Sequence, residues 1–79
     1  MDEDMQEFQR RLLEGIAQLQ TRQQIPRRLV LGQQDYAVFE RIKQLYPDYP
    51  NVIRVGGREH RWGMEIERAA AEEHLEVLP

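Results

Sequence analysis

The residues of this sequence best suited to binding chemistry are its arginines, which outnumber lysine by ten to one. Arg54, Arg58 and Arg61 lie close together along the chain, and Arg27 and Arg28 are adjacent. A guanidinium group binds a carboxylate or a phosphate through two parallel hydrogen bonds, which an ammonium group cannot do. A GC-rich genome produces the same excess of arginine, so the composition alone does not decide between binding and codon bias. The clusters make these five residues candidate contacts for an anionic partner.

Groups that could perform catalysis are few. His60 and His74 are the only histidines, and the chain has neither serine nor cysteine to act as a nucleophile beside them. Carboxylates are numerous, but they fall on positions predicted to face solvent. No spacing typical of a metal site occurs, and a metal-binding thiolate is excluded. We therefore expect no catalytic activity, no cofactor and no metal centre.

The arginines at 54, 58 and 61 lie in a segment whose pattern predicts a β-hairpin, Asn51–Glu67. Its second half alternates, as a strand with one buried face requires. One face takes His60, Trp62, Met64 and Ile66, and the other takes Glu59, Arg61, Glu65 and Glu67. Gly56 and Gly57 supply the left-handed conformations of a tight turn. A hairpin turn explains both glycines better than a phosphate-binding loop, whose spacing they do not match.

This turn fixes the register of the predicted hairpin. The opposed residues are Ile53 with His60, Arg54 with Glu59, and Val55 with Arg58. The central pair has opposite charges, so it predicts an ion pair across the strands. Ile53 and Val55 then share the face of Trp62, and we expect that face to be buried.

An amphipathic helix is predicted from Asp2 to about Gln20. Apolar residues recur at spacings of three and four and form a stripe of Met5, Phe8, Leu12, Ile16 and Leu19. The sequence leaves two interpretations open: the stripe covers the chain's own sheet, or it binds a partner or a second copy of the chain. In the second case Phe8, Leu12 and Ile16 are the candidate contacts. Gly15, close to the stripe, indicates the close approach of another element.

The remaining segments predict a small α+β fold. Arg28–Leu31 is expected to form a short strand, and a second helix begins at residues 33–35 and stops near Tyr46, before Pro47. Residues 69–74 are expected to form one or two helical turns, and Leu75–Leu78 a strand or a loose tail. We expect one domain over residues 1–79, with the first helix in 1–24 and an α+β body in 25–79. Both helices would cover one face of a three- or four-stranded sheet.

Length and charge restrict the function further. A chain of 79 residues buries a small core and leaves little room for an enzyme pocket. Its formal net charge of −3 is unusual for a nucleic-acid-binding module of this size. No apolar stretch approaches the roughly 20 residues of a membrane span. The acidic start lacks the features of a signal peptide, so we expect a soluble, cytoplasmic protein.

Two stretches resemble a known class of proteins: LVLGQQDYAVFERI (Leu29–Ile42) and GMEIERAAAEEHLEVLP (Gly63–Pro79). They are similar to small accessory proteins of tailed bacteriophages and prophages, in which a strand, a helix bearing Tyr or Phe, and a closing β element recur. That class contains virion components, assembly factors and inhibitors of host proteins. The resemblance implies a stoichiometric protein binder and assigns no functional residue.

The sequence thus predicts a non-enzymatic protein that binds another protein. The candidate contacts are Phe8, Leu12, Ile16, Arg27, Arg28, Arg54, Arg58 and Arg61. The first alternative is a nucleic-acid-binding module that uses the arginine-rich hairpin, and the second is a homodimer built on the first helix.

Overall fold

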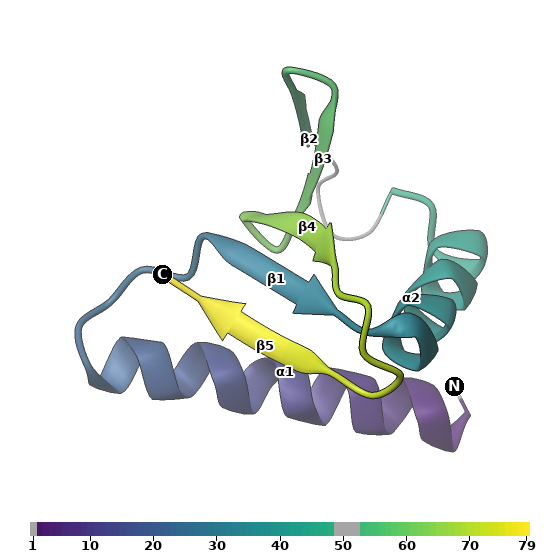
Figure 1. Ribbon diagram of the computed structural model, residues 1–79, viewed down its shortest axis with the longest axis horizontal. Coiled ribbons are helices and arrows are strands. Elements are labelled where there is room, and N and C mark those ends of the chain that lie inside the picture. Colours follow the sequence, from purple (N-terminus) through teal and green to yellow (C-terminus); the bar gives the residue numbers. More distant parts are fainter. Residues whose placement is uncertain (1, 49–52) are drawn as a thin grey trace.

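The computed structural model describes residues 2–48 and 53–79. Its elements are α1 (Glu3–Thr21), β1 (Arg28–Leu31), α2 (Gln33–Leu45), β2 (Ile53–Val55), β3 (Arg58–Arg61), β4 (Met64–Arg68) and β5 (Leu75–Leu78). The strands of this described part form one five-stranded sheet in the order β2-β3-β4-β1-β5 (Figure 1). β1 and β4 are parallel, and the other neighbours are antiparallel. The α+β class and the order of helix, strand, helix and hairpin are confirmed, with more strands than the three or four expected.

α1 forms where the sequence predicts it, and hydrogen bonds cap the helix at both ends. The side chain of Asp2 accepts a hydrogen bond from the backbone N–H of Met5 at 2.9 Å, which satisfies one of the free donors of the first turn. At the other end Gln23 adopts φ 59°. Its N–H donates to Gln20 O and that of Gln24 to Leu19 O, at 2.9 Å each. This pair of bonds is the Schellman arrangement that closes a helix.

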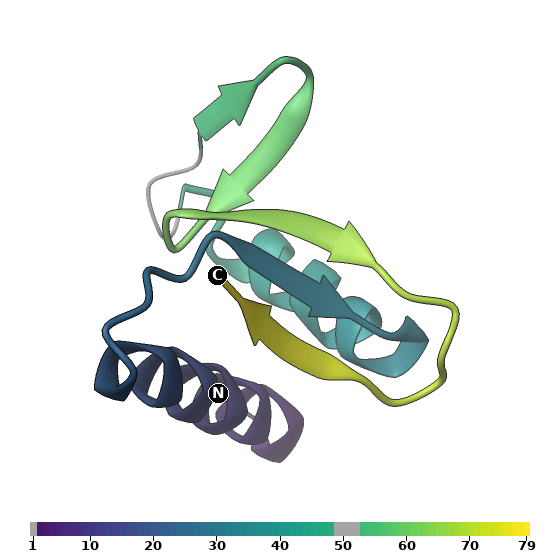
Figure 2. The same ribbon diagram turned by 60° about the vertical axis from the view of Figure 1, so that its left-hand side comes forward.

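Both helices pack on one face of the sheet, and the core lies between them and the strands. α1 runs alongside β5, and α2 lies behind β1 (Figure 2). The fully buried side chains come from both helices and from the central strands: Phe8, Leu12, Leu29, Leu31, Phe39, Ile42 and Met64. The stripe on α1 therefore covers the chain's own sheet, which confirms the first of its two interpretations.

The opposite face of the sheet is turned away from both helices, and we call it the open face. The register of the strands assigns to it Arg28, Val30, Ile53, Val55, Arg58, His60, Glu65, Glu67, Glu76 and Leu78. Arg28, Glu65, His60 and Ile53 form one row across four neighbouring strands.

The predicted second strand of the hairpin is in fact two strands. β3 ends at Arg61, and Trp62 and Gly63 form a tight turn with φ 56° and 74°. In one continuous strand Arg61 and Met64 would point to opposite faces, but across this turn they are paired and share a face. The prediction that Arg61 faces solvent is therefore wrong, and its exposed fraction is 4%.

The predicted register of the Gly56–Gly57 hairpin is confirmed, but the predicted burial of Ile53 and Val55 is not. Gly56 and Gly57 have φ 59° and 78°, and Ile53, Arg54 and Val55 pair with His60, Glu59 and Arg58 as expected. Ile53 and Val55 are nevertheless 56% and 60% exposed, because both lie on the open face. Residues 51 and 52, with which the predicted hairpin begins, lie outside the described residues.

The C-terminal part settles one open expectation and corrects another. Residues 70–73 form bends instead of the expected helical turns, and two of their carbonyl groups accept hydrogen bonds from α2. Ala71 O and Glu72 O each accept a hydrogen bond at 2.9 Å, from Gln33 N and Gln34 N at the start of that helix. Leu75–Leu78 forms the strand β5, antiparallel to β1.

Gly15 allows α1 to approach β5 closely, as expected. A Cβ atom at this position would lie 2.7 Å from Val77 Cγ2, well inside van der Waals contact. We therefore expect Gly15→Val to lower the free energy of unfolding by about 1–3 kcal/mol through overpacking. Ala17→Val, at an exposed position of the same helix, should change it by less than about 1 kcal/mol. Urea unfolding followed by circular dichroism measures both, and a fully stable Gly15→Val chain would contradict the close contact.

Candidate protein-binding hairpin

The β2–β3 hairpin projects from the body of the molecule (Figure 1). β2 is an edge strand with β3 as its neighbour, and no strand of the described residues lies on the other side of its backbone. Ile53 and Val55 place two aliphatic side chains, each more than half exposed, on that strand. Exposed apolar groups on an unpaired strand edge are features of a site that binds a protein segment.

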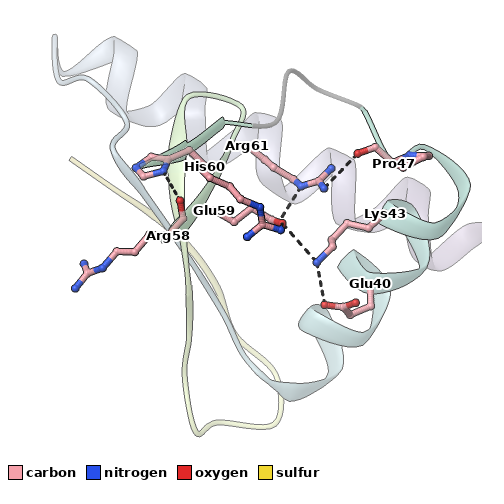
Figure 3. Close-up of polar contacts among 8 residues, drawn as sticks. Glu40, Lys43, Pro47, Arg58, Glu59, His60 and Arg61 are labelled. Atoms are coloured by element: carbon pink, nitrogen blue, oxygen red, sulfur yellow. Dashed lines mark hydrogen bonds and ion pairs between the residues drawn. The ribbon is translucent and has the colours of Figure 1, made fainter. Parts of the chain in front are cut away.

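The base of the hairpin is attached to α2 by a charged cluster centred on Glu59 (Figure 3). The Glu59 carboxylate accepts a hydrogen bond from Arg61 Nε at 3.2 Å and lies 3.5 Å from a guanidinium nitrogen of Arg54. Lys43 of α2 places its ammonium group 3.6 Å from Glu59 and 3.3 Å from Glu40. The predicted Arg54–Glu59 ion pair is thus confirmed, and Glu59 also joins the hairpin to the helix.

Arg61 anchors the hairpin in the core. Besides Glu59, its guanidinium contacts Pro47 O at 3.4 Å and lies 5.6 Å from the centre of the Phe39 ring. The same ring is 6.0 Å from that of Trp62, at the turn into β4. A buried guanidinium is stable only where its charge and its N–H groups are satisfied. Arg61 is therefore a structural residue of the folded chain, which corrects its expected role as an exposed partner contact.

The other two arginines of the hairpin are exposed but lie on opposite faces. The side chains of Arg54 and Arg58 are 67% and 71% exposed. Arg54 shares Glu59 with Arg61 on the side of α2, whereas Arg58 lies on the open face, 2.6 Å from Glu65. Each of the three has a carboxylate within 4 Å. The three arginines therefore do not form one continuous basic surface on the hairpin.

Arg27 and Arg28 lie at the start of β1. Arg28 lies on the open face, and its guanidinium is 3.7 Å from Glu67. Arg28 is paired across the strands with Glu65, which is paired in turn with His60 of the hairpin. Arg27 uses its backbone, donating from N–H to Leu78 O at 2.8 Å and accepting from Glu65 N–H at 2.9 Å. Of the predicted arginines, the structure brings Arg28 and Arg58 together on one face, around Glu65.

The predicted contacts on α1 are not available on the folded chain. Phe8 and Leu12 are each 1% exposed, and Ile16 packs against the same core. A partner or a second copy could reach this stripe only if α1 left the sheet. Of the two interpretations of the stripe, the structure supports packing on the chain's own sheet, and it does not expose Phe8, Leu12 and Ile16 as partner contacts.

The two histidines take part in local contacts. Nδ1 of His60 lies 3.2 Å from Arg58 O. Nε2 of His74 lies 3.3 Å from a carboxylate oxygen of Glu76. Over residues 2–48 and 53–79, no three histidine, cysteine or acidic side chains are grouped so that they could hold a metal ion.

Asp35 is a buried residue that the sequence analysis did not single out. Its carboxylate is 2.8 Å from Arg11 of α1 and accepts a hydrogen bond from the backbone N–H of His74 at 3.0 Å. A carboxylate in the first turn of a helix looks like an ordinary surface charge in sequence. The burial of Asp35 could have been suspected only from Arg11 on the other predicted helix, and no rule of sequence spacing pairs these two residues.

Tyr36, on the first turn of α2, has a raised pKa. Burial of the phenol is the main cause, and a hydrogen bond and the charge of Glu40 raise the pKa further. The guanidinium carbon of Arg68 lies 4.3 Å from the centre of the Tyr36 ring. This stack attaches the end of β4 to α2 and leaves the open face free of both side chains.

Comparison with protein-family models, with curated proteins and with solved structures gave no match. In the described part of the chain, no helix is both long enough and apolar enough to span a bilayer.

The Glu59 cluster predicts a difference between two neutralising substitutions. Glu59→Gln leaves Arg61 buried without its carboxylate and should lower the free energy of unfolding by about 3 kcal/mol. Glu67→Gln removes the pair with the more exposed Arg28 and should change it by less than about 1 kcal/mol. Urea unfolding of both variants provides the measurement. Equal effects would show that Glu59 does not stabilise the hairpin.

Proposed function

We propose that this protein binds another protein through the open face of its sheet, with the β2–β3 hairpin as the central contact, and that it catalyses no reaction. The observation that carries the proposal is the exposure of Ile53 and Val55 on an edge strand that projects from the body. Aliphatic side chains exposed on a strand edge gain free energy when a partner covers them.

The charges of the open face favour a protein partner over a nucleic acid. Beside Ile53 and Val55 the face carries two arginines and three glutamates, Arg28, Arg58, Glu65, Glu67 and Glu76. A nucleic acid would meet excess negative charge there, and its phosphates would gain nothing from the aliphatic groups. A protein surface with apolar side chains and charges of both signs complements this arrangement.

The attachment of the hairpin supports the same conclusion. Arg61 donates a part-buried hydrogen bond to Glu59, and the Glu59 carboxylate forms an ion pair with Lys43 of α2, which holds the base of the hairpin against that helix. An element that is ordered before binding loses less conformational entropy when it binds. We expect the hairpin to present Ile53 and Val55 in one fixed arrangement.

The cellular role that we infer follows from the resemblance of residues 29–42 and 63–79 to phage accessory proteins. A small binder of this kind would act stoichiometrically, as an inhibitor of a host protein or as an accessory in virion assembly. We place its action in the cytoplasm, the host cytoplasm if the protein is phage-encoded. The absence of cysteine is consistent with that compartment.

Affinity capture with matched variants tests this proposal. The tagged full chain is exposed to nuclease-treated bacterial lysate beside the double variant Ile53→Glu, Val55→Glu. The control is Leu13→Glu, which changes a 63% exposed apolar residue on α1. A stoichiometric protein partner should bind the wild type and the control equally and the double variant at least about 30-fold more weakly, the loss typical of a binding hot spot.

Two results would contradict this function. A partner retained equally by all three chains would show that the hairpin is not the contact. Material that is retained only when nuclease is omitted would instead favour the nucleic-acid alternative, with the arginines of the hairpin as its contacts.

A further inference from the structure

The outer edge of β2 is exposed at each of its three residues. Ile53, Arg54 and Val55 are all exposed, and the hairpin that carries them projects from the body of the molecule (Figure 1). No described strand lies beyond β2 in the sheet order. The other edge of the sheet differs in this respect, since Val77 of β5 is buried against α1. Of the two edges, β2 is therefore the one that a further strand could reach.

The register of the hairpin identifies the peptide groups that face outward on β2. Val55 and Arg58 are paired directly beside the two-residue turn of Gly56 and Gly57, and the pair beside such a turn exchanges its backbone hydrogen bonds. Because bonded and non-bonded pairs alternate along an antiparallel ladder, the N–H and C=O groups of Arg54 point away from β3. Arg54 thus offers one donor and one acceptor to an added strand.

The side chain of Arg54 belongs to a cluster with excess positive charge. Ion pairs join Arg54, Arg61 and Lys43 to Glu59, and Lys43 also to Glu40. Three cations therefore share two carboxylates. Arg54 is the most exposed of these cations, at 67% of its side chain, and its nearest contact to Glu59 is long, at 3.5 Å. A carboxylate placed beside Arg54 would complement the cluster.

We propose, on the basis of the binding function assigned to the hairpin, that the partner contributes an extended segment to β2 as an antiparallel strand. Its central residue is Asp or Glu, which lies opposite Arg54 and exchanges two backbone hydrogen bonds with it. The residue on each side of this acid is aliphatic. Since side chains alternate between the faces of a sheet, these two residues lie beside Ile53 and Val55 on the open face.

A second copy of the chain does not fit this edge. Within β2 only residue 54 has outward peptide groups, so two antiparallel copies of β2 would pair with Arg54 opposite Arg54. Like charges directly opposite each other in a sheet are destabilising. The same side chain that selects an acidic segment therefore disfavours pairing of the chain with itself.

Titration of the full chain with synthetic peptides, followed by NMR, tests the chemistry of the segment. The probe is acetyl-Thr-Val-Glu-Val-Thr-amide, and the control peptide has Lys in place of Glu. The acidic peptide should shift the Arg54 amide resonance and bind at least about tenfold more tightly than the control, as expected for one charged pair.

Two matched variants locate the source of this preference. Arg54→Gln should reduce the preference for the acidic peptide to less than about threefold. Arg58→Gln removes the same charge from the same hairpin, at a 71% exposed side chain on the open face, and should leave the preference unchanged. An equal loss in both variants would show that the peptides respond to net charge only, and would overturn the proposal.

Backbone methylation of the peptide separates strand addition from charge attraction. A methyl group on the nitrogen of Glu removes the donor to Arg54 and should weaken binding at least about tenfold, with every side chain retained. A methyl group on the nitrogen of the following Val lies on the outward side of the added strand and should weaken binding less than about threefold. Equal effects of the two methyl groups would exclude the proposed pairing.

The result of the titration is independent of whether the hairpin binds a protein by another mode. If the acidic peptide causes no shift of the Arg54 amide at concentrations up to about 5 mM, strand addition at β2 is wrong. A cellular partner that still depends on Ile53 and Val55 would then retain the function assigned to the hairpin, with contacts through side chains of the open face alone.

Discussion

The fold depends on one buried carboxylate. Asp35 is only 7% exposed, and burying a charged group is unfavourable unless it is paired. Its two partners belong to other segments: Arg11 of α1, and the backbone N–H of His74 just before β5. Gly32 completes this junction, since a Cβ there would lie 2.7 Å from Ala71 O. Asp35 therefore joins α1, the start of α2 and the segment that leads into β5.

The same arrangement divides the molecule into a packed side and an accessible side. Phe8, Phe39 and Trp62 bring their rings within 6.5 Å of one another beneath the sheet, and Arg61 covers Phe39. Neither of the two described helices covers the open face (Figure 2). The apolar pair at 53 and 55 is exposed on the accessible side, and this exposure is the physical basis of the proposed binding function.

Local rules predicted the parts of the fold that local interactions determine. Two consecutive glycines fixed the register of the first turn and the Arg54–Glu59 pair, and apolar spacing located α1. The turn at Trp62 was missed because tryptophan rarely adopts positive φ, and the alternation around it hid the reversal that buries Arg61. Neither the exposure of Ile53 nor the burial of Asp35 follows from local pattern, since both depend on which elements lie opposite them.

The central claim is that the hairpin touches another protein, and site-specific photocrosslinking in bacterial cells tests it most directly. A photoreactive phenylalanine analogue replaces Val55 in one chain and Leu13, on the exposed side of α1, in a matched chain. The account predicts a discrete covalent adduct with one protein from position 55 and none from position 13. Identical adducts from both positions, or none from position 55, would contradict it.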